Sequence, residues 1–314
     1  MKGELKKRWE SEPGFGFVEM LERWGRSGNG YEVRESPFGV VPETGRVDLR
    51  GLAFPEATFL IDMRRLIFRF ADFTGAVLNR THIEACTFSD VLFDMCSLRH
   101  IAEIGNTFEN CSFRSASFRG AGLGHRGSRY KQCRFERADF IQAGFIRAEF
   151  DDCLFDSCIF GGIDFSASSF ERCEFRGEVR GVWFRGSYDI SVFEQFANPR
   201  PNRMTCVSFK KAKLFDVTFS DGCDLSSVIP PDDGRHALFD RWPERIKSLF
   251  EQSRAWPEPC KTAGEVFFRS HVAHPRRDGT FPKTQEWYLL GLDDLMNQFG
   301  EEAGAKIWEA LLSA

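Results

Sequence analysis

Cysteine and histidine are the residues in this chain whose chemistry would suit metal binding. The sequence has 10 Cys and 6 His among 314 residues. His271 and His274 lie three positions apart, with Cys260 and Glu265 nearby. One short histidine pair without a second cysteine pair is a weak signal for zinc. We therefore expect no metal and no cofactor.

Catalytic motifs are the next possibility. The segment Gly120–Gly124 is rich in glycine, but it does not sit at the turn from a strand into a helix, where a phosphate-binding loop belongs. A nucleophile elbow is also missing. The sequence therefore predicts a protein that is not an enzyme and has no catalytic residues.

The central part of the sequence repeats with an unusual period of five residues. Phenylalanine occupies nine successive fifth positions: Phe135, Phe140, Phe145, Phe150, Phe155, Phe160, Phe165, Phe170 and Phe175. The residue two places earlier is nearly always small. A helix repeats every 3.6 residues and a strand every 2, so a period of five fits neither. It indicates a solenoid that turns a corner after every few residues and buries one large and one small side chain on each side.

The same register extends over Val47–Leu225 with three interruptions. At Arg99–Gly105 the position expected to be large and apolar holds Glu103. Two extra residues shift the register at Gly124–Ser128. The longest break runs over about 176–206.

The repeat explains most of the cysteines. Eight of the ten occupy the small position: Cys86, Cys96, Cys111, Cys133, Cys153, Cys158, Cys173 and Cys223. A free thiol behaves there as a small hydrophobe. Three of them, at 133, 153 and 173, are expected to stack closely enough that a disulfide is conceivable, but we favour free thiols in the core.

Two stretches, Ala71–Gly75 (ADFTG) and Ala138–Gln142 (ADFIQ), resemble the A-(D/N)-(L/F)-x-x consensus of the pentapeptide-repeat family. The resemblance extends over about 180 of the 314 residues. It implies a mainly β fold, a right-handed quadrilateral β-helix in which four pentapeptides make one coil. Residues twenty apart would then stack in columns at about 4.8 Å, with the large and small residues inward.

We expect three parts in the chain. Residues 1–45, with a short helix at about 15–25, form an N-terminal cap or, alternatively, a separate arm that binds a partner. Residues 46–228 form the β-helix, with the insertion at 176–206. Residues 229–314 form an α-helical C-terminal region, with helices at about 236–256, 284–299 and 301–312.

Charge and hydropathy bear on the compartment of the protein and on the kinds of partner it has. The formal net charge is −4, which does not favour nucleic acid or an anionic membrane. No run of 18 apolar residues predicts a membrane span, and the first residues do not read as a signal peptide. We expect a cytoplasmic, bacterial-type protein without direct nucleic-acid or membrane contact.

The preferred functional hypothesis is a protein–protein interaction scaffold with an unidentified partner. Loops on a rigid frame often carry function, so the 176–206 segment is one candidate surface, through Trp183, Tyr188, Phe193, Phe196 and Arg200. The alternative for this segment is an inert insertion whose aromatic rings pack on the solenoid. The resemblance also implies a possible homodimer through the C-terminal region, for which Trp308, Leu311 and Leu312 are candidates, although core packing is the commoner fate of such residues.

The alternative hypothesis also comes from the resemblance. Some pentapeptide-repeat proteins mimic DNA, bind DNA gyrase and protect it from drugs. Residues 46–228 carry 24 Lys+Arg and 24 Asp+Glu, which argues against mimicry by the whole rod, since duplex DNA is densely negative. A local acidic patch within 139–174 keeps the idea open; its members are Asp139, Glu149, Asp151, Asp152, Asp156 and Asp164.

Overall fold

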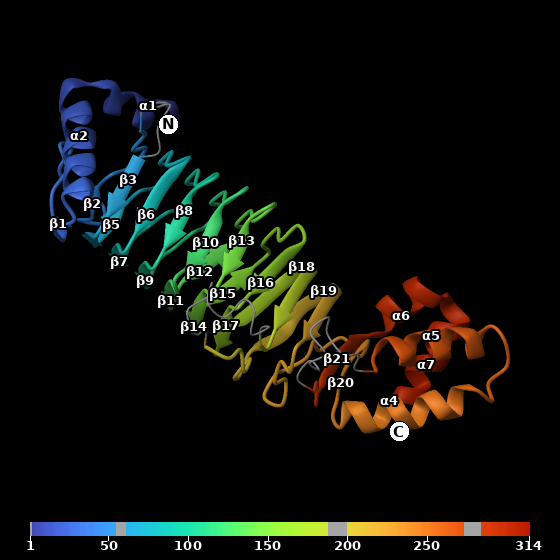
Figure 1. Cartoon of the computed structure of the whole chain (residues 1–314). Helices are drawn as coiled ribbons and strands as arrows, with labels where there is room; N and C mark the ends of the chain where they lie inside the picture. Colours follow the sequence, from blue (N-terminus) through green and yellow to red (C-terminus); the bar gives the residue numbers. More distant parts are fainter. Residues whose placement is uncertain (1, 55–60, 188–199, 273–283) are drawn as a thin grey trace.

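The computed structural model describes residues 2–54, 61–187, 200–272 and 284–314. Helices lie at the N-terminal end, a long stack of β-coils follows, and a mixed C-terminal region closes the chain (Figure 1). The middle part is a right-handed quadrilateral β-helix of about seven coils. This confirms the fold that the five-residue period predicts.

The first two faces of the solenoid are parallel sheets. The first face contains β3 (Ile61–Arg64), β6 (Thr81–Glu84), β8 (Ala102–Ile104), β10 (Gly122–His125), β13 (Gly144–Ile146) and β16 (Ile163–Ser166). The second face contains β1 (Tyr31–Val33), β4 (Leu66–Arg69), β7 (Thr87–Ser89), β9 (Thr107–Glu109), β11 (Arg129–Lys131), β14 (Glu149–Asp151) and β17 (Ser169–Glu171).

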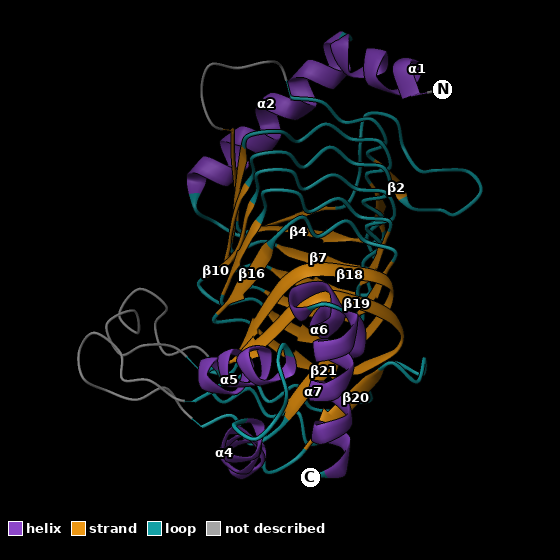
Figure 2. Ribbon diagram, turned by 90° about the vertical axis from the view of Figure 1, so that its right-hand side faces the viewer, coloured by secondary structure: helices purple, strands orange, loops and turns teal. Residues whose placement is uncertain are grey.

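The other two faces are built more sparsely. The third face contains β2 (Val47–Asp48), β5 (Ala71–Asp72), β12 (Arg134–Glu136), β15 (Leu154–Asp156) and the start of β18 (Glu174–Arg185). The fourth face has single bridges that link Ala53, Val77, Ser97, Ser117, Asp139 and Ile159 in turn. These bridges appear as the stacked teal turns in the upper half of Figure 2.

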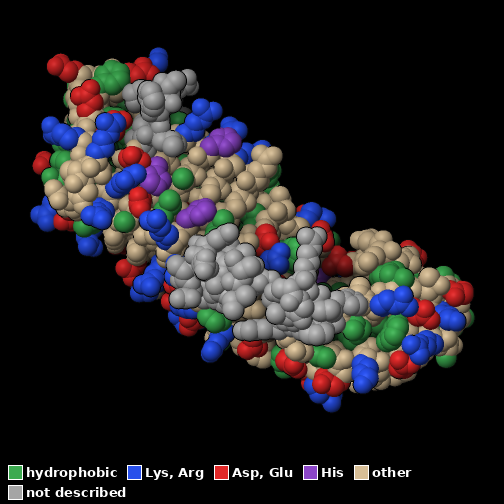
Figure 3. All heavy atoms as spheres, viewed as in Figure 1, with side chains coloured by type: hydrophobic (Ala, Val, Ile, Leu, Met, Phe, Trp, Pro, Cys, Tyr) green, Lys and Arg blue, Asp and Glu red, His purple; other side chains and the backbone are tan. Residues whose placement is uncertain are grey.

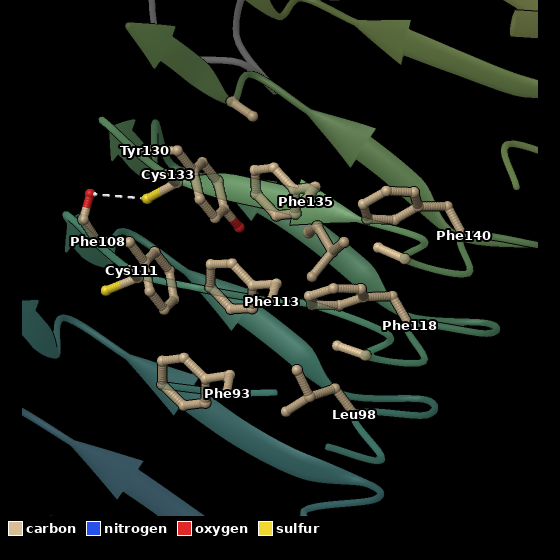
Figure 4. Close-up of a cluster of buried hydrophobic side chains, with 14 of the residues drawn as sticks. Phe93, Leu98, Phe108, Cys111, Phe113, Phe118, Tyr130, Cys133, Phe135 and Phe140 are labelled. Atoms are coloured by element: carbon tan, nitrogen blue, oxygen red, sulfur yellow. Dashed lines mark hydrogen bonds between the residues drawn. The ribbon is translucent and has the colours of Figure 1, made fainter. Parts of the chain in front are cut away.

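Stacked aromatic rings fill the interior. The third-face column contains Phe73, Phe93, Phe113, Phe135, Phe155, Phe175 and Phe209, with neighbouring ring centroids between 4.8 and 5.2 Å apart. Rings on adjacent faces meet edge to face, as Phe88 and Phe93 do at 5.2 Å. Figure 4 shows how the columns interlock. Such pairs add to the gain from burying each ring.

Sharp corners join the faces. The residue two positions after the inward one adopts a left-handed backbone at most corners, for example Arg80 (φ 58°), Asp90 (φ 56°) and Gln132 (φ 54°). This conformation costs a non-glycine residue about 1–2 kcal/mol. The stacked ladders hold the corners in place, since each corner amide donates to the coil above, as from Arg80 N to Arg99 O at 2.9 Å.

Glu103 occupies an inward position and is 1 % exposed. Its carboxylate accepts hydrogen bonds from Gly124 N and Asn106 Nδ2, both at 2.6 Å, and from Tyr130 Oη at 3.2 Å. The predicted two-residue insertion at 124–128 brings the Gly124 amide to this carboxylate. The two irregularities of the repeat therefore form one buried polar cluster.

Nine of the ten cysteines are buried and all ten are free thiols, while Cys206 is exposed. The small-position cysteines pack inside the solenoid, where Cys133 Sγ donates to Phe108 O at 3.5 Å (Figure 4). Burial raises the pKa of Cys86 and of Cys158 to about 12. These two thiols are therefore protonated at neutral pH, and the thiolate is the reactive form.

We expect one thiol per chain to react quickly with Ellman's reagent at pH 8, and the remaining nine to react only after unfolding in guanidinium chloride. Cys206→Ser removes the fast phase. Several fast thiols in the native protein would contradict the packing of the small inward positions.

The last coils depart from the four-sided pattern. Strand β18 pairs with β15 at Phe175 and with β16 at Phe184, so it runs from the third face to the first as one strand. Strand β19 (Ser208–Ser220) lies beside it in parallel. Residues 176–185, at the start of the 176–206 segment, are therefore a paired strand and not part of a loop.

The N-terminal helices cover the first coil. They are α1 (Lys2–Lys7), a 3-10 turn (Arg8–Glu10) and α2 (Glu12–Ser27). Phe17 and Leu21 of α2 belong to the solenoid core. Asp48 on the first coil accepts from Arg8 Nη2 at 2.6 Å and from Arg50 Nη2 at 2.9 Å. Burial opposes ionisation of Asp48, but these hydrogen bonds outweigh it and lower its pKa.

The C-terminal region has its own core and a small antiparallel sheet. Its elements are β20 (His236–Phe239), α4 (Trp242–Ser253), α5 (Cys260–Ser270), β21 (Tyr288–Gly291), α6 (Leu292–Phe299) and α7 (Glu301–Ser313). Helix α7 confirms the helix predicted at 301–312. The helices predicted at 236–256 and 284–299 are wrong at their starts, because these segments pair with each other as β20 and β21. Tertiary pairing overrides local spacing here.

This region docks on the end of the solenoid. Gln285 accepts from Cys223 N at 3.0 Å and donates to Cys223 O at 2.6 Å. Leu289 of β21 is part of the solenoid core. Asp216 N of β19 donates to Asp294 Oδ1 of α6 at 3.3 Å.

Candidate interaction surfaces

The outer side of β18 presents Trp183, which is 41 % exposed. The guanidinium of Arg185 stacks on its ring at 3.8 Å from the centroid. The indole nitrogen donates to Ser220 Oγ of β19 at 2.8 Å. The ring is thus held in one orientation on a paired strand.

Arg185 is fixed from two sides. It donates to Asp164 through Nη2 at 2.9 Å and to Asp221 through Nη1 at 3.3 Å. Burial disfavours its charge, but the two carboxylates outweigh this and raise the pKa of Arg185. The Trp183–Arg185 pair is therefore a pre-ordered aromatic and cationic surface, since little side-chain freedom remains to be lost on binding.

A cleft of about 490 Å³ separates β19 from the C-terminal region. Arg180 and Phe215 line the solenoid side, with the guanidinium 4.2 Å from the ring centroid. Tyr288 and Asp294 line the other side. Burial raises the pKa of Tyr288 to about 12 and also raises the pKa of Asp294.

The acidic residues singled out in the sequence are spread over the solenoid surface. Glu149 and Asp151 lie on the second face, Asp156 on the third, Asp139 on the fourth and Asp164 on the first, while Asp152 lies at a corner. A five-residue period sends successive outward positions to successive faces. The structure therefore does not bring the six together on one side.

Most of these carboxylates are also paired with a base one coil away. Glu149 meets Arg129 at 3.2 Å, and Asp164 meets Arg185 at 2.9 Å. Asp139 pairs with Arg119 and Asp151 with Arg172. Asp152 accepts from Gln132 at 3.3 Å and Asp156 from Ser157 at 2.8 Å. Figure 3 shows basic and acidic side chains interspersed over the visible face of the solenoid.

Comparison with known proteins gives matches to solved structures alone. No protein-family model matches the sequence, and no protein of curated function does. The matching structures include full-length QnrB1, a plasmid-mediated fluoroquinolone resistance protein, at 16 % identity and a TM-score of 0.25, covering 55 % of this chain and 92 % of that one. They also include HetL from Nostoc sp. strain PCC 7120, a pentapeptide-repeat protein involved in heterocyst differentiation regulation, at 15 % identity and a TM-score of 0.23, covering 59 % and 86 %. At this level of similarity the matches carry no argument about function.

The coil geometry decides the fold. Every fifth residue points inward, four such residues complete a coil, and ladders join residues about twenty positions apart on four faces. The chain folds as a pentapeptide-repeat solenoid. The A-D-F motifs at 71–73 and 138–140 lie inside this repeat, with Phe73 and Phe140 buried.

The other sequence-predicted residues of the 176–206 segment have different positions. Arg200 Nη2 lies 3.6 Å from Glu171 Oε2 at the edge of the last full coil. Tyr188, Phe193 and Phe196 lie outside the described residues. The structure therefore brings Trp183 together with Arg185, which the sequence did not single out.

The C-terminal candidates differ in accessibility. Trp308 and Leu311 are buried in the core of the C-terminal region, where Trp308 meets Phe239 edge to face at 5.8 Å. Leu312 is 57 % exposed. Of the three residues suggested for a dimer or partner interface, only Leu312 is accessible in this chain.

The described residues lack both a candidate metal cluster and a candidate membrane-spanning helix. Those residues hold no cluster of three or more His, Cys, Asp or Glu side chains placed to bind a metal. The same residues include no helix with the length and hydropathy that crossing a bilayer requires. His271 lies against Phe267 and Tyr288, and burial lowers its pKa; His274 is outside the described part.

Proposed function

We propose that this pentapeptide-repeat protein is a non-catalytic scaffold that binds a partner protein. The observation that carries the proposal is the exposed Trp183 with Arg185 stacked on it at 3.8 Å. Tryptophan and arginine are enriched among the residues that dominate binding energy at interfaces. Strands β18 and β19 supply a rigid base for them. We propose further contacts through the 176–206 segment and the C-terminal helices, where Leu312 is 57 % exposed.

DNA mimicry with gyrase as the partner is the competing function. A mimic needs unpaired negative charge along one side. Pairing of most acids with a base one coil away supports the scaffold instead. Changing Asp151, Asp152 and Asp156 together to Lys is expected to leave partner binding unchanged, and the protein is expected not to rescue gyrase from a fluoroquinolone in a supercoiling assay. Drug protection that this charge reversal abolishes would favour mimicry.

The proposal is tested by the affinity of full-length variants for a captured partner. Trp183→Ala is expected to weaken binding by about 2 kcal/mol or more, roughly thirtyfold, as truncation of a central interface tryptophan does. Phe70→Ala is the matched control, because Phe70 is also an exposed aromatic residue (47 %) but lies on an early coil, several coils away from Trp183. Circular dichroism checks that both variants keep the fold. Equal affinities for the two variants would contradict the proposal.

A further inference from the structure

The fourth face of the solenoid is a ladder of short rungs. Each rung donates its inward residue's amide to the rung above, from Leu98 N to Ser117 O at 2.8 Å and from Phe140 N to Ile159 O at 2.8 Å. In return, the carbonyl oxygen two residues before the inward residue accepts a hydrogen bond from the next rung, as Ala138 O does from Ile159 N at 2.9 Å. Every rung therefore has one donor and one acceptor for its successor.

The ladder stops at the rung Cys158–Phe160. Strand β18 reaches Phe184 on the first face nine residues after Phe175, where the preceding coil takes ten residues from Phe155 to Phe165. It crosses the fourth face within one strand, with corners at Gly177 (φ 76°) and Gly181 (φ 62°) and Val179 buried between them. In the described part of the chain, residues 178–180 make no backbone hydrogen bond to the rung Cys158–Phe160. The strands β18 and β19 span the solenoid as two long arcs in Figure 2.

The last rung is consequently left with open backbone groups. Among the described residues, no backbone hydrogen bond uses Phe160 N or Cys158 O. Ile159, between them, is 51 % exposed. A hollow of about 520 Å³ lies over this rung, between Ser157–Gly162 and Glu178–Gly181 of β18.

The hollow has defined ends. A Cβ placed on Gly177 would lie 3.1 Å from Ser157 Cα, and one on Gly181 would lie 3.5 Å from Gly162 Cα. Strand β18 therefore contacts the coil at both ends of the rung, and the hollow separates the two between these contacts. We call this hollow the fourth-face notch.

We propose that the fourth-face notch binds a short extended segment of a partner polypeptide, which pairs with the open backbone groups of the rung Cys158–Phe160. The open stretch of about four residues spans roughly 13 Å at 3.3 Å per residue, and the added strand would lie about 4.8 Å from the rung. Unpaired strand edges are templates for such pairing, in which backbone bonds supply affinity and side-chain pockets supply selectivity.

The lining indicates the chemistry of the segment. Ile159 and Phe160 offer apolar contact, and glycines let the backbone approach closely. On the opposite wall Arg180 Nε donates to Glu178 Oε1 at 2.6 Å, so this ion pair already neutralises itself. An uncharged segment with an apolar side chain over Ile159 fits best, because a charged one would lose hydration without gaining a partner.

This inference rests on the proposed scaffold function and adds a second contact surface to it. The test uses the full-length protein, amide hydrogen exchange read by NMR, and the capped tetrapeptide Ser-Val-Ser-Val as probe. In the free protein the Phe160 amide is expected to exchange far faster than the Phe140 amide, which is bonded. Saturating peptide is expected to slow Phe160 exchange about tenfold, whereas the same peptide with N-methylated alternate amides has no effect.

Two variants complete the test. Ile159→Lys is expected to abolish the peptide effect, because lysine blocks strand edges. Met95→Lys, at a 40 % exposed position on a fully paired coil, is expected to keep it. Equal exchange of the two amides in the free protein, no response of Phe160 to the peptide, or protection of Phe160 by a dimer of this chain would each overturn the inference. Binding at Trp183 is measured separately, so failure here is distinguishable from failure of the scaffold proposal.

Discussion

Replacing Phe155 with alanine is expected to lower the free energy of unfolding by about 3–5 kcal/mol. The ring is 1 % exposed. It stacks between Phe135 at 4.9 Å and Phe175 at 4.8 Å. The variant removes both contacts and leaves a cavity that the rigid coils cannot close, so the cost exceeds simple transfer of the ring to water.

Chemical denaturation followed by far-UV circular dichroism measures this change. Phe70→Ala is the control, since Phe70 points outward at a corner and is 47 % exposed; its cost is expected to stay below about 1 kcal/mol. A loss below about 1 kcal/mol for Phe155→Ala would mean that the stacked column does not hold the coils together.

The second large effect is expected at Glu103, where the apolar residue that the repeat favours should lower the free energy of unfolding. The repeat favours a large apolar residue here, and the column neighbours are Ile83 and Leu123. Glu103→Leu removes the acceptor for the Gly124 amide and for Tyr130 Oη. Buried donors left without a partner cost about 1–3 kcal/mol each, so we expect a net loss of about 2–4 kcal/mol. Ile83→Leu in the same column is the volume-matched control and should cost less than about 1.5 kcal/mol.

The cost of Glu103→Leu should also depend on pH. Burial raises the pKa of Glu103, and the hydrogen bonds to its carboxylate only partly oppose this. A carboxyl with a raised native pKa contributes stability below its ordinary pKa and loses it as the pH rises through the native value. Unfolding at pH 4.5 and at pH 8 should therefore show the larger cost at pH 4.5. A larger cost at pH 8 would mean that the cluster holds the charged form.

The sequence was sufficient to predict the solenoid because its signal is local and periodic. Inward rings such as Phe135 and Phe155 repeat at a spacing that only a four-sided coil accommodates. Even Glu103 was recognisable as an exception in an inward position. The sequence did not reveal the hydrogen-bond partners of Glu103, because the Gly124 amide and Tyr130 reach its carboxyl group only through the stacking of coils.

The surface was less predictable. Trp183 was singled out, but as part of a loop, because Val179 follows Phe175 by four residues and so breaks the five-residue period. Arg185 was missed, although its alternation with Trp183 along a strand was a usable signal. The acids at 139–164 are near neighbours in sequence, yet the corners distribute them over four faces. His236–Phe239 carried helical spacing but pairs with a strand some fifty residues away in sequence.

The most direct test of the scaffold is site-specific photo-crosslinking of the full-length protein in living cells, with p-benzoylphenylalanine in place of Trp183. Position 70 serves as the matched exposed aromatic site. We expect a discrete crosslinked protein from position 183 that is absent from position 70. No protein crosslinked at position 183, or the same products from both positions, would contradict it.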